Sequence, residues 1–191
     1  MGMFRVARTL VCVTLLASVL SCATPETQQP RTVSELDELF ARLRTAASAE
    51  EAEGIETAIV SVWTRSGDAT VDRMMGDAFR AIHGSDLVGA ESILDRVVQR
   101  APDFAEGFNM RATVRMLREE YHGAAQDLRR TLSLEPRHFA ALVNLGRLFM
   151  LVGEDAAALS AFETALEYNP HMPQVRKRVD ELRDQVVGVP I

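Results

Sequence analysis

The side chains that most often carry catalysis or bind metals are few in this sequence and lie far apart. Its two cysteines, Cys12 and Cys22, are both near the start of the chain. The histidines stand near expected helix ends or turns, without the i, i+4 pairing of zinc ligands on one helix: His83, His122, His138 and His171. Neither a glycine-rich phosphate loop nor a Gly-x-Ser-x-Gly motif occurs. We therefore predict no catalytic residue, no cofactor and no metal.

Composition and charge describe a globular protein that does not bind nucleic acid. Hydrophobic residues make up 47% of the 191 residues and charged residues 25%, which is enough for one domain with a sizeable core. The formal net charge is -6 and the sequence pI is about 5.3. An acidic chain gains no general attraction to phosphate backbones or anionic lipids. Nucleic acid is therefore excluded as an expected partner.

The first residues have the pattern of a bacterial export signal. Arg5 and Arg8 precede an apolar run over residues 10–20, which is too short to span a bilayer as a helix. The segment Val-Leu-Ser-Cys that ends at Cys22 resembles the lipobox of bacterial lipoproteins, in which the cysteine becomes the lipidated first residue. Ordinary cleavage after Ala23 is the alternative, because Ser-Cys-Ala also has the small-x-small form.

These observations predict a lipoprotein-type signal peptide over residues 1–22 with lipidation at Cys22. The resemblance to enterobacterial lipoproteins implies outer-membrane sorting, with the protein facing the periplasm, because Ala23 rather than aspartate follows the cysteine. Cleavage at Ala23 would instead give a soluble periplasmic protein. Residues 23–33 are polar with two prolines, so we predict a flexible tether and membrane contact only through the N-terminal lipid.

A regular sequence repeat dominates the rest of the chain. Pro102, Pro136 and Pro170 stand at equal intervals. An alanine stands twelve residues before each proline: Ala90, Ala124 and Ala158. A large apolar residue stands eight residues before: Leu94, Leu128 and Phe162. Alanine or glycine stands twenty-four residues before: Ala78, Ala112 and Gly146. Small residues allow two helices to approach closely, and proline ends a helix.

The interval between these prolines and the residues before them resemble the tetratricopeptide repeat (TPR), a pair of antiparallel helices of about 34 residues. The resemblance predicts an all-α, right-handed α-solenoid of about three TPR hairpins, over residues 71–104, 105–138 and 139–172. Residues 34–70 are expected to form an N-terminal helical hairpin, which is either a cap or a degenerate repeat. Residues 173–187 are expected to form a C-terminal capping helix with one apolar side.

The resemblance also implies a binding surface, because the first helix of each TPR pair lines a concave groove that receives peptides or helices. The positions that map to this partner groove are Met75, Phe79, Asn109, Thr113, Val143, Asn144 and Arg147. Methionine and phenylalanine offer adaptable apolar contact, asparagine can bond a peptide backbone, and arginine can bind a carboxylate. The carboxylate clamp of chaperone-binding TPR proteins is absent, since Met75 and Phe79 replace its lysine and asparagine.

An arginine stripe on one helix has two interpretations. Arg111, Arg115 and Arg118 share a helical face in an otherwise acidic protein. The stripe could meet an acidic partner, or it could pair with aspartate and glutamate of the adjacent repeat. The only tryptophan, Trp63, is expected in the core.

The expected function is that of a non-catalytic scaffold or adaptor of the bacterial cell envelope. It would bind one or more envelope proteins of unknown identity in the TPR groove. A self-associating structural module of the envelope is the alternative. An enzyme would require a convergent polar pocket, which the residue pattern does not provide.

Overall fold

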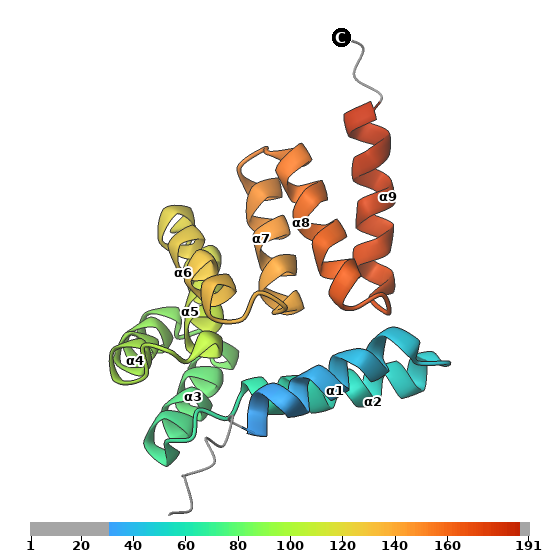
Figure 1. Cartoon of the computed structure of the whole chain (residues 1–191). Coiled ribbons are helices and arrows are strands. Elements are labelled where there is room, and N and C mark those ends of the chain that lie inside the picture. The colour runs from blue at the N-terminus through green and yellow to red at the C-terminus, as the bar shows by residue number, and fades with distance from the viewer. Residues whose placement is uncertain (1–30, 188–191) are drawn as a thin grey trace, which may run out of the picture.

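The computed structural model describes residues 31–187, and within that range the protein consists of α-helices without a strand (Figure 1). The helices are α1 (Arg31–Thr45), α2 (Ala49–Trp63), α3 (Ala69–His83), α4 (Leu87–Arg100), α5 (Ala105–Leu117), α6 (Tyr121–Leu134), α7 (Phe139–Leu151), α8 (Asp155–Tyr168) and α9 (Pro173–Val187). None of these helices is both long and apolar enough to cross a membrane. The predicted signal peptide and Cys22 lie outside the described residues.

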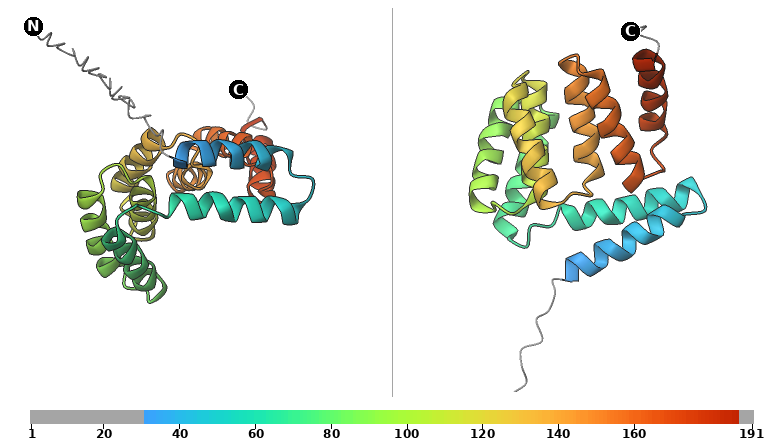
Figure 2. Two further views of the ribbon diagram at one scale, coloured as in Figure 1. Left: turned by 60° about the horizontal axis from the view of Figure 1, so that its bottom comes forward. Right: turned by 45° about the horizontal axis from the view of Figure 1, so that its top comes forward.

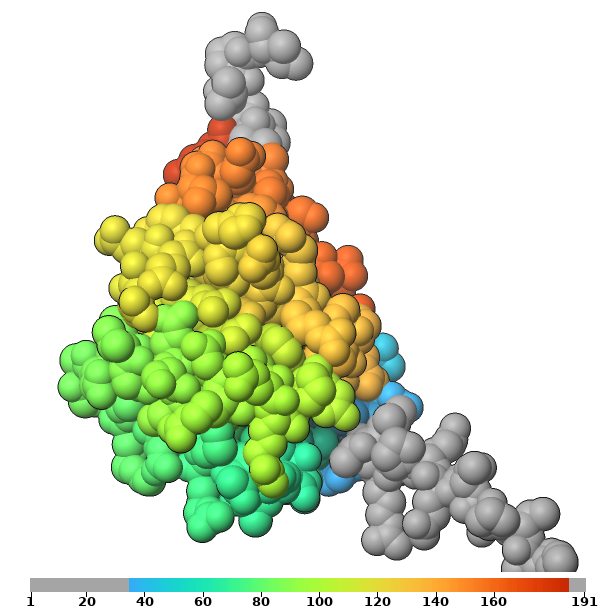
Figure 3. All heavy atoms as spheres, turned by 90° about the vertical axis from the view of Figure 1, so that its left-hand side faces the viewer, coloured from blue at the N-terminus to red at the C-terminus, as the bar shows by residue number. Residues whose placement is uncertain are grey.

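Helices α3 to α9 form a solenoid in which each helix packs against the next one along the chain. The pairs α5–α6 and α7–α8 fall in the second and third predicted repeats. The pair α3–α4 falls in the first, except that α3 begins at Ala69, two residues before the predicted boundary. Helix α9 follows α8 as the final described helix (Figure 1). On the face seen in Figure 3, the repeats succeed one another along a continuous surface. The structure confirms the predicted all-α helical repeat fold.

Small residues lie where the two helices of a repeat come closest, as the sequence predicts. Ala78 and Ala112 are fully buried in the first and second repeats. In the third repeat, a Cβ atom added at Gly146 would lie 2.6 Å from Cε1 of Phe162, which is inside van der Waals contact. The ring of Phe162 in α8 thus fills the space beside Gly146 in α7, so the two helices pack closely at this point.

The turn inside each repeat contains one residue with positive φ. These residues are Ser85 (φ 62°), Glu119 (φ 62°) and Gly153 (φ 79°), which stand at the same interval as the repeat prolines. In each turn the next residue donates its backbone N–H to a carbonyl five residues earlier, as in Glu120 N to Arg115 O at 2.8 Å. The left-handed conformation costs a non-glycine residue about 1 kcal/mol, so the repeat geometry overrides local preference at two of three turns.

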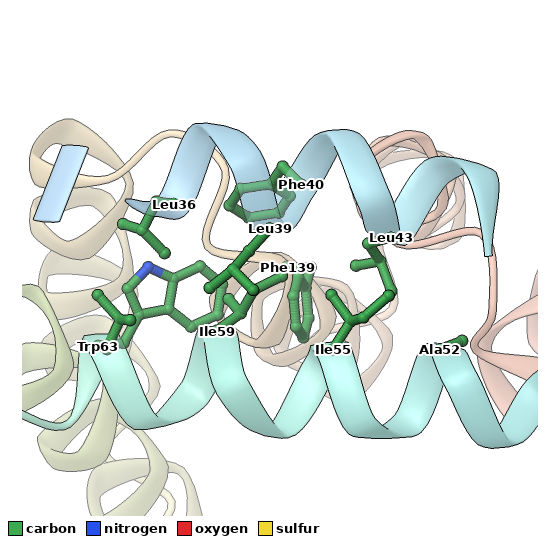
Figure 4. Packing of buried hydrophobic residues seen from close by; sticks show 10 residues of the cluster. Leu36, Leu39, Phe40, Leu43, Ala52, Ile55, Ile59, Trp63 and Phe139 are labelled. Atoms are coloured by element: carbon green, nitrogen blue, oxygen red, sulfur yellow. The ribbon is translucent and has the colours of Figure 1, made fainter. Parts of the chain in front are cut away.

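The N-terminal hairpin, α1 and α2, lies crosswise beneath the ends of α7, α8 and α9 rather than in line with the repeats (Figures 1 and 2). Its core contains Phe40 and Trp63 together with Phe139 from the first residue of α7, and Tyr168 and Met172 pack against it (Figure 4). Among the described residues, no side chain of α3 belongs to this core. The hairpin therefore covers an edge of the solenoid formed by the turns between repeats.

Polar contacts join the same hairpin to that edge. Arg137 pairs with Asp37 at 2.6 Å, and its guanidinium carbon lies 4.7 Å from the centroid of the Phe40 ring. Asn169 Nδ2 donates to Glu56 Oε2 at 2.9 Å. Helix α1 begins at Arg31, three residues before the expected start of the hairpin and inside the predicted tether. Trp63 is 8% exposed, so its predicted place in the core is confirmed.

Candidate functional site

A groove runs along α7 and is the main candidate for a binding surface. Its wider part has a volume of about 770 Å³ and lies between the α5–α6 turn, α7 and α9. A narrower part of about 380 Å³ continues toward α2 and the α8–α9 turn. The two parts share Val143, Arg147, Gln174 and Val175, so they form one surface, which we call the α7 groove.

The wider part of the α7 groove is mainly apolar and partly charged. Met116 and Leu117 from the end of α5 and Met150 and Leu151 from the end of α7 line it. Leu117 is 57% exposed and Leu151 54% exposed, and with the two methionines they line one pocket, so they form an apolar patch rather than isolated exposed leucines. The charged groups at its rim are Arg147, Arg178 and Glu119. Such a surface can bury apolar side chains of a ligand while a guanidinium binds an acceptor.

Three of the seven residues expected from the sequence line the α7 groove: Val143, Asn144 and Arg147. Thr113 lies beside them, because its Oγ1 accepts a hydrogen bond from Asn144 Nδ2 at 3.2 Å. Arg147 is exposed, and its Nη1 contacts Asn144 Oδ1 at 3.4 Å rather than a carboxylate.

The other three expected residues are placed differently. Met75 is buried in the core of the first repeat. Asn109 is 6% exposed, with Oδ1 bound to Asn144 and Nδ2 to Glu106, so its amide is engaged inside the protein. Phe79 is 54% exposed on α3, where its ring meets the edge of His83, but it lines neither part of the α7 groove. The first repeat therefore contributes nothing to the groove lining.

Sequence reasoning missed several residues that shape the groove. Helix α9, expected only as a cap, provides one wall through Gln174, Val175 and Arg178. Glu56 of α2 lines the narrow end. His138 lies in the turn before α7, near a helix end as the sequence indicates, and caps that helix through Nδ1, which accepts the N–H of Ala141 at 3.2 Å; its burial, at 1% exposed, was not predicted. No spacing in the sequence links these residues, since the contacts join separate elements.

The arginine stripe pairs with carboxylates of α4, of α6 and of the turn between α5 and α6, so the second of its two interpretations is confirmed. Arg111 forms a two-pronged pair with Asp127, at 2.9 and 2.6 Å, and also binds Asp95 at 2.7 Å. Arg115 binds Asp127 and Glu91, each at 2.8 Å. Arg118 pairs with Glu91 and Glu120. We call this cluster the α4–α6 ion network; it stands where leucine and an aromatic residue are usual in the repeat.

The ion network raises the pKa of its central arginine, Arg111. Burial lowers the pKa of Arg111, but the hydrogen bonds and charges of Asp127 and Asp95 outweigh burial and raise the pKa above its usual value. Arg137, at the hairpin edge, behaves in the same way. Burial lowers its pKa, and Glu135 and Asp37 together raise it. Arginine is charged at every ordinary pH, so the carboxylates stabilise these two cations and offset the cost of their burial.

The described residues offer no metal centre of the usual kind: no three His, Cys, Asp or Glu side chains within residues 31–187 cluster closely enough to hold an ion.

Comparisons with known proteins agree with the repeat architecture. No family model matches the chain. It is 31% identical over 153 residues to a TPR repeat-containing protein of Rhizobium etli, an alignment that covers 80% of this chain and 75% of the relative.

Solved structures show the same fold at low sequence identity. One is the first TPR domain of RPAP3 (Spaghetti) bound to the HSP90 peptide SRMEEVD, with a TM-score of 0.60 and 12% identity over 63% of this chain and 96% of that one. Another is the Yersinia enterocolitica type III secretion chaperone SycD in complex with a peptide of the translocator YopD. Its TM-score is 0.58 and its identity 14%, over 62% of this chain and 95% of that one. With its repeat spacing, its helix pairs and its relative in Rhizobium, this chain belongs to the tetratricopeptide-repeat proteins.

Proposed function

We propose that this protein is a non-catalytic adaptor that binds a linear segment of a partner protein in the α7 groove. The partner segment places apolar side chains on Met116, Leu117, Met150 and Leu151 and an acceptor group on Arg147. The observation that carries the proposal is that exposed leucines end α5 and α7, the first helices of two successive repeats. They lie beside Arg147, which pairs with no carboxylate among the residues that the structure describes.

The chemistry of the groove favours a peptide over a small polar ligand. Two methionines and two leucines form its wide part, and methionine adapts its shape to different apolar side chains. Exposed apolar patches rimmed by charge are typical of protein interaction sites. The proteins of similar fold support the same interpretation, since the RPAP3 domain holds an HSP90 peptide and SycD holds a peptide of YopD.

The groove is tested by crosslinking and affinity capture of the mature protein from its native envelope. The groove variant combines Leu117→Ser, Arg147→Ala and Leu151→Ser. All three side chains are exposed, so the variant should fold as the native protein does. The matched control is Arg129→Ala, an exposed arginine of α6 that does not line the groove.

A partner that is captured by the native protein and by the control, but lost from the groove variant, would support the proposal. Equal capture by all three proteins would show that partners bind elsewhere. A second copy of the chain as the groove-dependent partner would establish the self-associating module instead. Sedimentation at several concentrations would then show a mass that rises in the native protein and not in the groove variant.

We also propose that the protein is exported and works in the bacterial cell envelope. The signal-like start of the chain and the lipobox ending at Cys22 support this proposal. Lipidation of Cys22 would anchor the protein to the outer membrane, facing the periplasm. Mass spectrometry of the mature N-terminal peptide distinguishes the outcomes: a diacylated Cys22 supports the lipoprotein, and a first residue at Thr24 indicates the soluble periplasmic form. A chain that retains Met1 in the cytoplasm would contradict export.

A further inference from the structure

A chain of contacts runs from the N-terminal hairpin to the centre of the α7 groove. The ring of Trp63 lies on the ring of His138, with centroids 4.0 Å apart and planes 10° from parallel. His138 Nε2 bonds Glu106 Oε2 at 2.9 Å, and the same oxygen accepts Asn109 Nδ2 at 3.1 Å. Asn109 Oδ1 accepts Asn144 Nδ2 at 3.1 Å, and Asn144 Oδ1 faces Arg147 Nη1.

Two groups at the buried end of this series of contacts, the His138 ring and the Glu106 carboxylate, determine the direction of its hydrogen bonds. His138 Nδ1 accepts the N–H of Ala141, so the ring proton is on Nε2 and is donated to Glu106. A carboxylate accepts only, so Asn109 must turn its NH₂ toward Glu106 and its Oδ1 toward Asn144.

The same reasoning fixes the group that the groove presents. Asn144 must turn its NH₂ toward Asn109 Oδ1, and the second proton of that NH₂ is taken by Thr113 Oγ1 at 3.2 Å. Asn144 Oδ1 is then the amide atom that faces the groove. It accepts a hydrogen bond from Arg147 Nη1 at 3.4 Å and keeps a second lone pair for a ligand. The groove therefore offers one acceptor and one cationic donor side by side.

The series of contacts is buried, and therefore rigid, at His138, and it is exposed and adaptable at Arg147. His138 is 1% exposed and Asn109 is 6% exposed, whereas Arg147 is exposed. Turning the Asn109 amide around would leave buried polar atoms without hydrogen-bond partners. The free-energy cost of such unpaired atoms keeps the amide in its observed orientation. Trp63 covers His138 from the hairpin, and it is the only tryptophan in the sequence.

We propose that Glu106 is a positioning residue of the α7 groove, which fixes the amides of Asn109 and Asn144 and thereby links docking of the α1–α2 hairpin to partner binding. This inference rests on the proposed function of the groove. It adds that Glu106, which does not line the groove, determines which atom of Asn144 the partner meets. It also makes the hairpin part of the binding unit rather than a separate cap.

The first test needs no ligand, because it measures how firmly hydrogen bonds hold the NH₂ groups of the two asparagines. In ¹H–¹⁵N spectra of the mature chain, the side-chain NH₂ groups of Asn109 and Asn144 should exchange slowly with water. Glu106→Gln removes the acceptor-only group at nearly constant size, because a glutamine side chain can donate or accept. We expect faster exchange at both asparagines in this variant. The control Glu167→Gln changes a glutamate of α8 that does not line the groove and should leave both exchange rates unchanged.

The second test measures binding of a probe peptide, chosen from a random twelve-residue display library by selection on the native protein. Glu106→Gln should weaken its binding about three- to tenfold, the range expected when one polar contact is misplaced. In an Asn144→Ala background, Glu106→Gln should have little further effect, since the amide that Glu106 orients toward the partner is already gone. Binding of the peptide should shift the emission of Trp63 in the native protein and not in Glu106→Gln.

The outcomes separate this inference from the proposed function. If Arg147→Ala and Leu151→Ser weaken the peptide but Glu106→Gln does not, the groove binds and Glu106 is only structural. A loss from Glu106→Gln that persists in full in the Asn144→Ala background would likewise overturn the positioning role. If none of the three substitutions changes affinity, the selected peptide binds elsewhere and the proposed function itself fails. Unchanged amide exchange in Glu106→Gln would overturn the inference whatever the peptide does.

Discussion

The indole ring of Trp63 and the imidazole ring of His138 are stacked, with 4.0 Å between their centroids and 10° between their planes. One ring ends α2 and the other is the N-cap of α7, so the pair joins the N-terminal hairpin to the second and third repeats. Phe139, the first residue of α7, extends this contact because its ring meets both Trp63 and Phe40 of the hairpin. The solenoid is thus fastened along an edge as well as through neighbouring repeats.

Removal of the indole should therefore release the hairpin. We expect Trp63→Ala to lower the free energy of unfolding by about 3 kcal/mol or more, because a large buried aromatic ring leaves a cavity. Hydrogen exchange should show the amides of α1 and α2 opening before those of α8. Val60→Ala, at a residue of α2 that is 40% exposed, is the control and should change stability by less than about 0.5 kcal/mol. Uniform loss of protection across α1 to α9 would contradict an edge contact that can open separately.

Gly146 should not tolerate a methyl group. Gly146→Ala places Cβ 2.6 Å from the ring of Phe162, and the overlap should cost about 1–3 kcal/mol in urea unfolding. Phe162→Leu in the same chain should restore part of this loss, because the smaller side chain leaves room for the methyl group. If Gly146→Ala is neutral, the two helices of the third repeat are less tightly packed than the structure indicates.

Breaking the α4–α6 ion network should lower the free energy of unfolding strongly, whereas replacing the network by apolar side chains should lower it little. Asp127 is 3% exposed and binds both Arg111 and Arg115, so Asp127→Ala should destabilise the protein by about 3–5 kcal/mol. The triple variant Arg111→Leu, Arg115→Phe and Asp127→Leu should recover most of that loss, since apolar side chains of similar size need no ion partner. Thermal and urea unfolding of both variants would measure the difference. A triple variant no more stable than Asp127→Ala would mean that the network is needed for the packing of α4 on α5.

The pH dependence of the same network follows from the raised pKa of Arg111. A raised pKa contributes stability that is present below the pKa of the unfolded chain and is lost only as pH rises through the folded value. We therefore expect the penalty of Arg111→Leu alone to stay constant between about pH 6 and pH 9. A penalty that fell steeply within this interval, measured by urea unfolding, would show that another group titrates in the network.

The turns within repeats offer a matched pair of substitutions. Ser85→Gly should raise stability by up to about 1 kcal/mol, because glycine adopts positive φ without the penalty that serine pays. Gly153→Ala should lower it by about the same amount, since no atom lies within 4 Å of the added Cβ and only backbone strain remains. Thermal unfolding tests both changes. Opposite signs are expected, and equal signs would show that the two turns are not equivalent.

The repeat itself could be predicted from the sequence alone. Prolines, small residues and large apolar residues recur at a constant interval because each repeat contacts mainly its neighbours, so similar interfaces require similar residues at similar positions. This periodic constraint specified the helix pairs, the close approach at Gly146 and the three equivalent turns. The residue pattern also allowed internal pairing of the arginine stripe, which the structure confirms.

The hairpin edge and the polarity of the groove were decided only by tertiary structure. Trp63 and His138 lie far apart along the chain and belong to no common repeat register, so no spacing relates them. Asn109 occupies a position at which a TPR protein can contact its partner, yet here Glu106 and Asn144 engage both ends of its amide. Helix α9 becomes a groove wall because it packs on α8, the partner of α7, and so brings Gln174, Val175 and Arg178 beside the residues of α7. Such contacts depend on which surfaces meet after folding, which a local pattern does not encode.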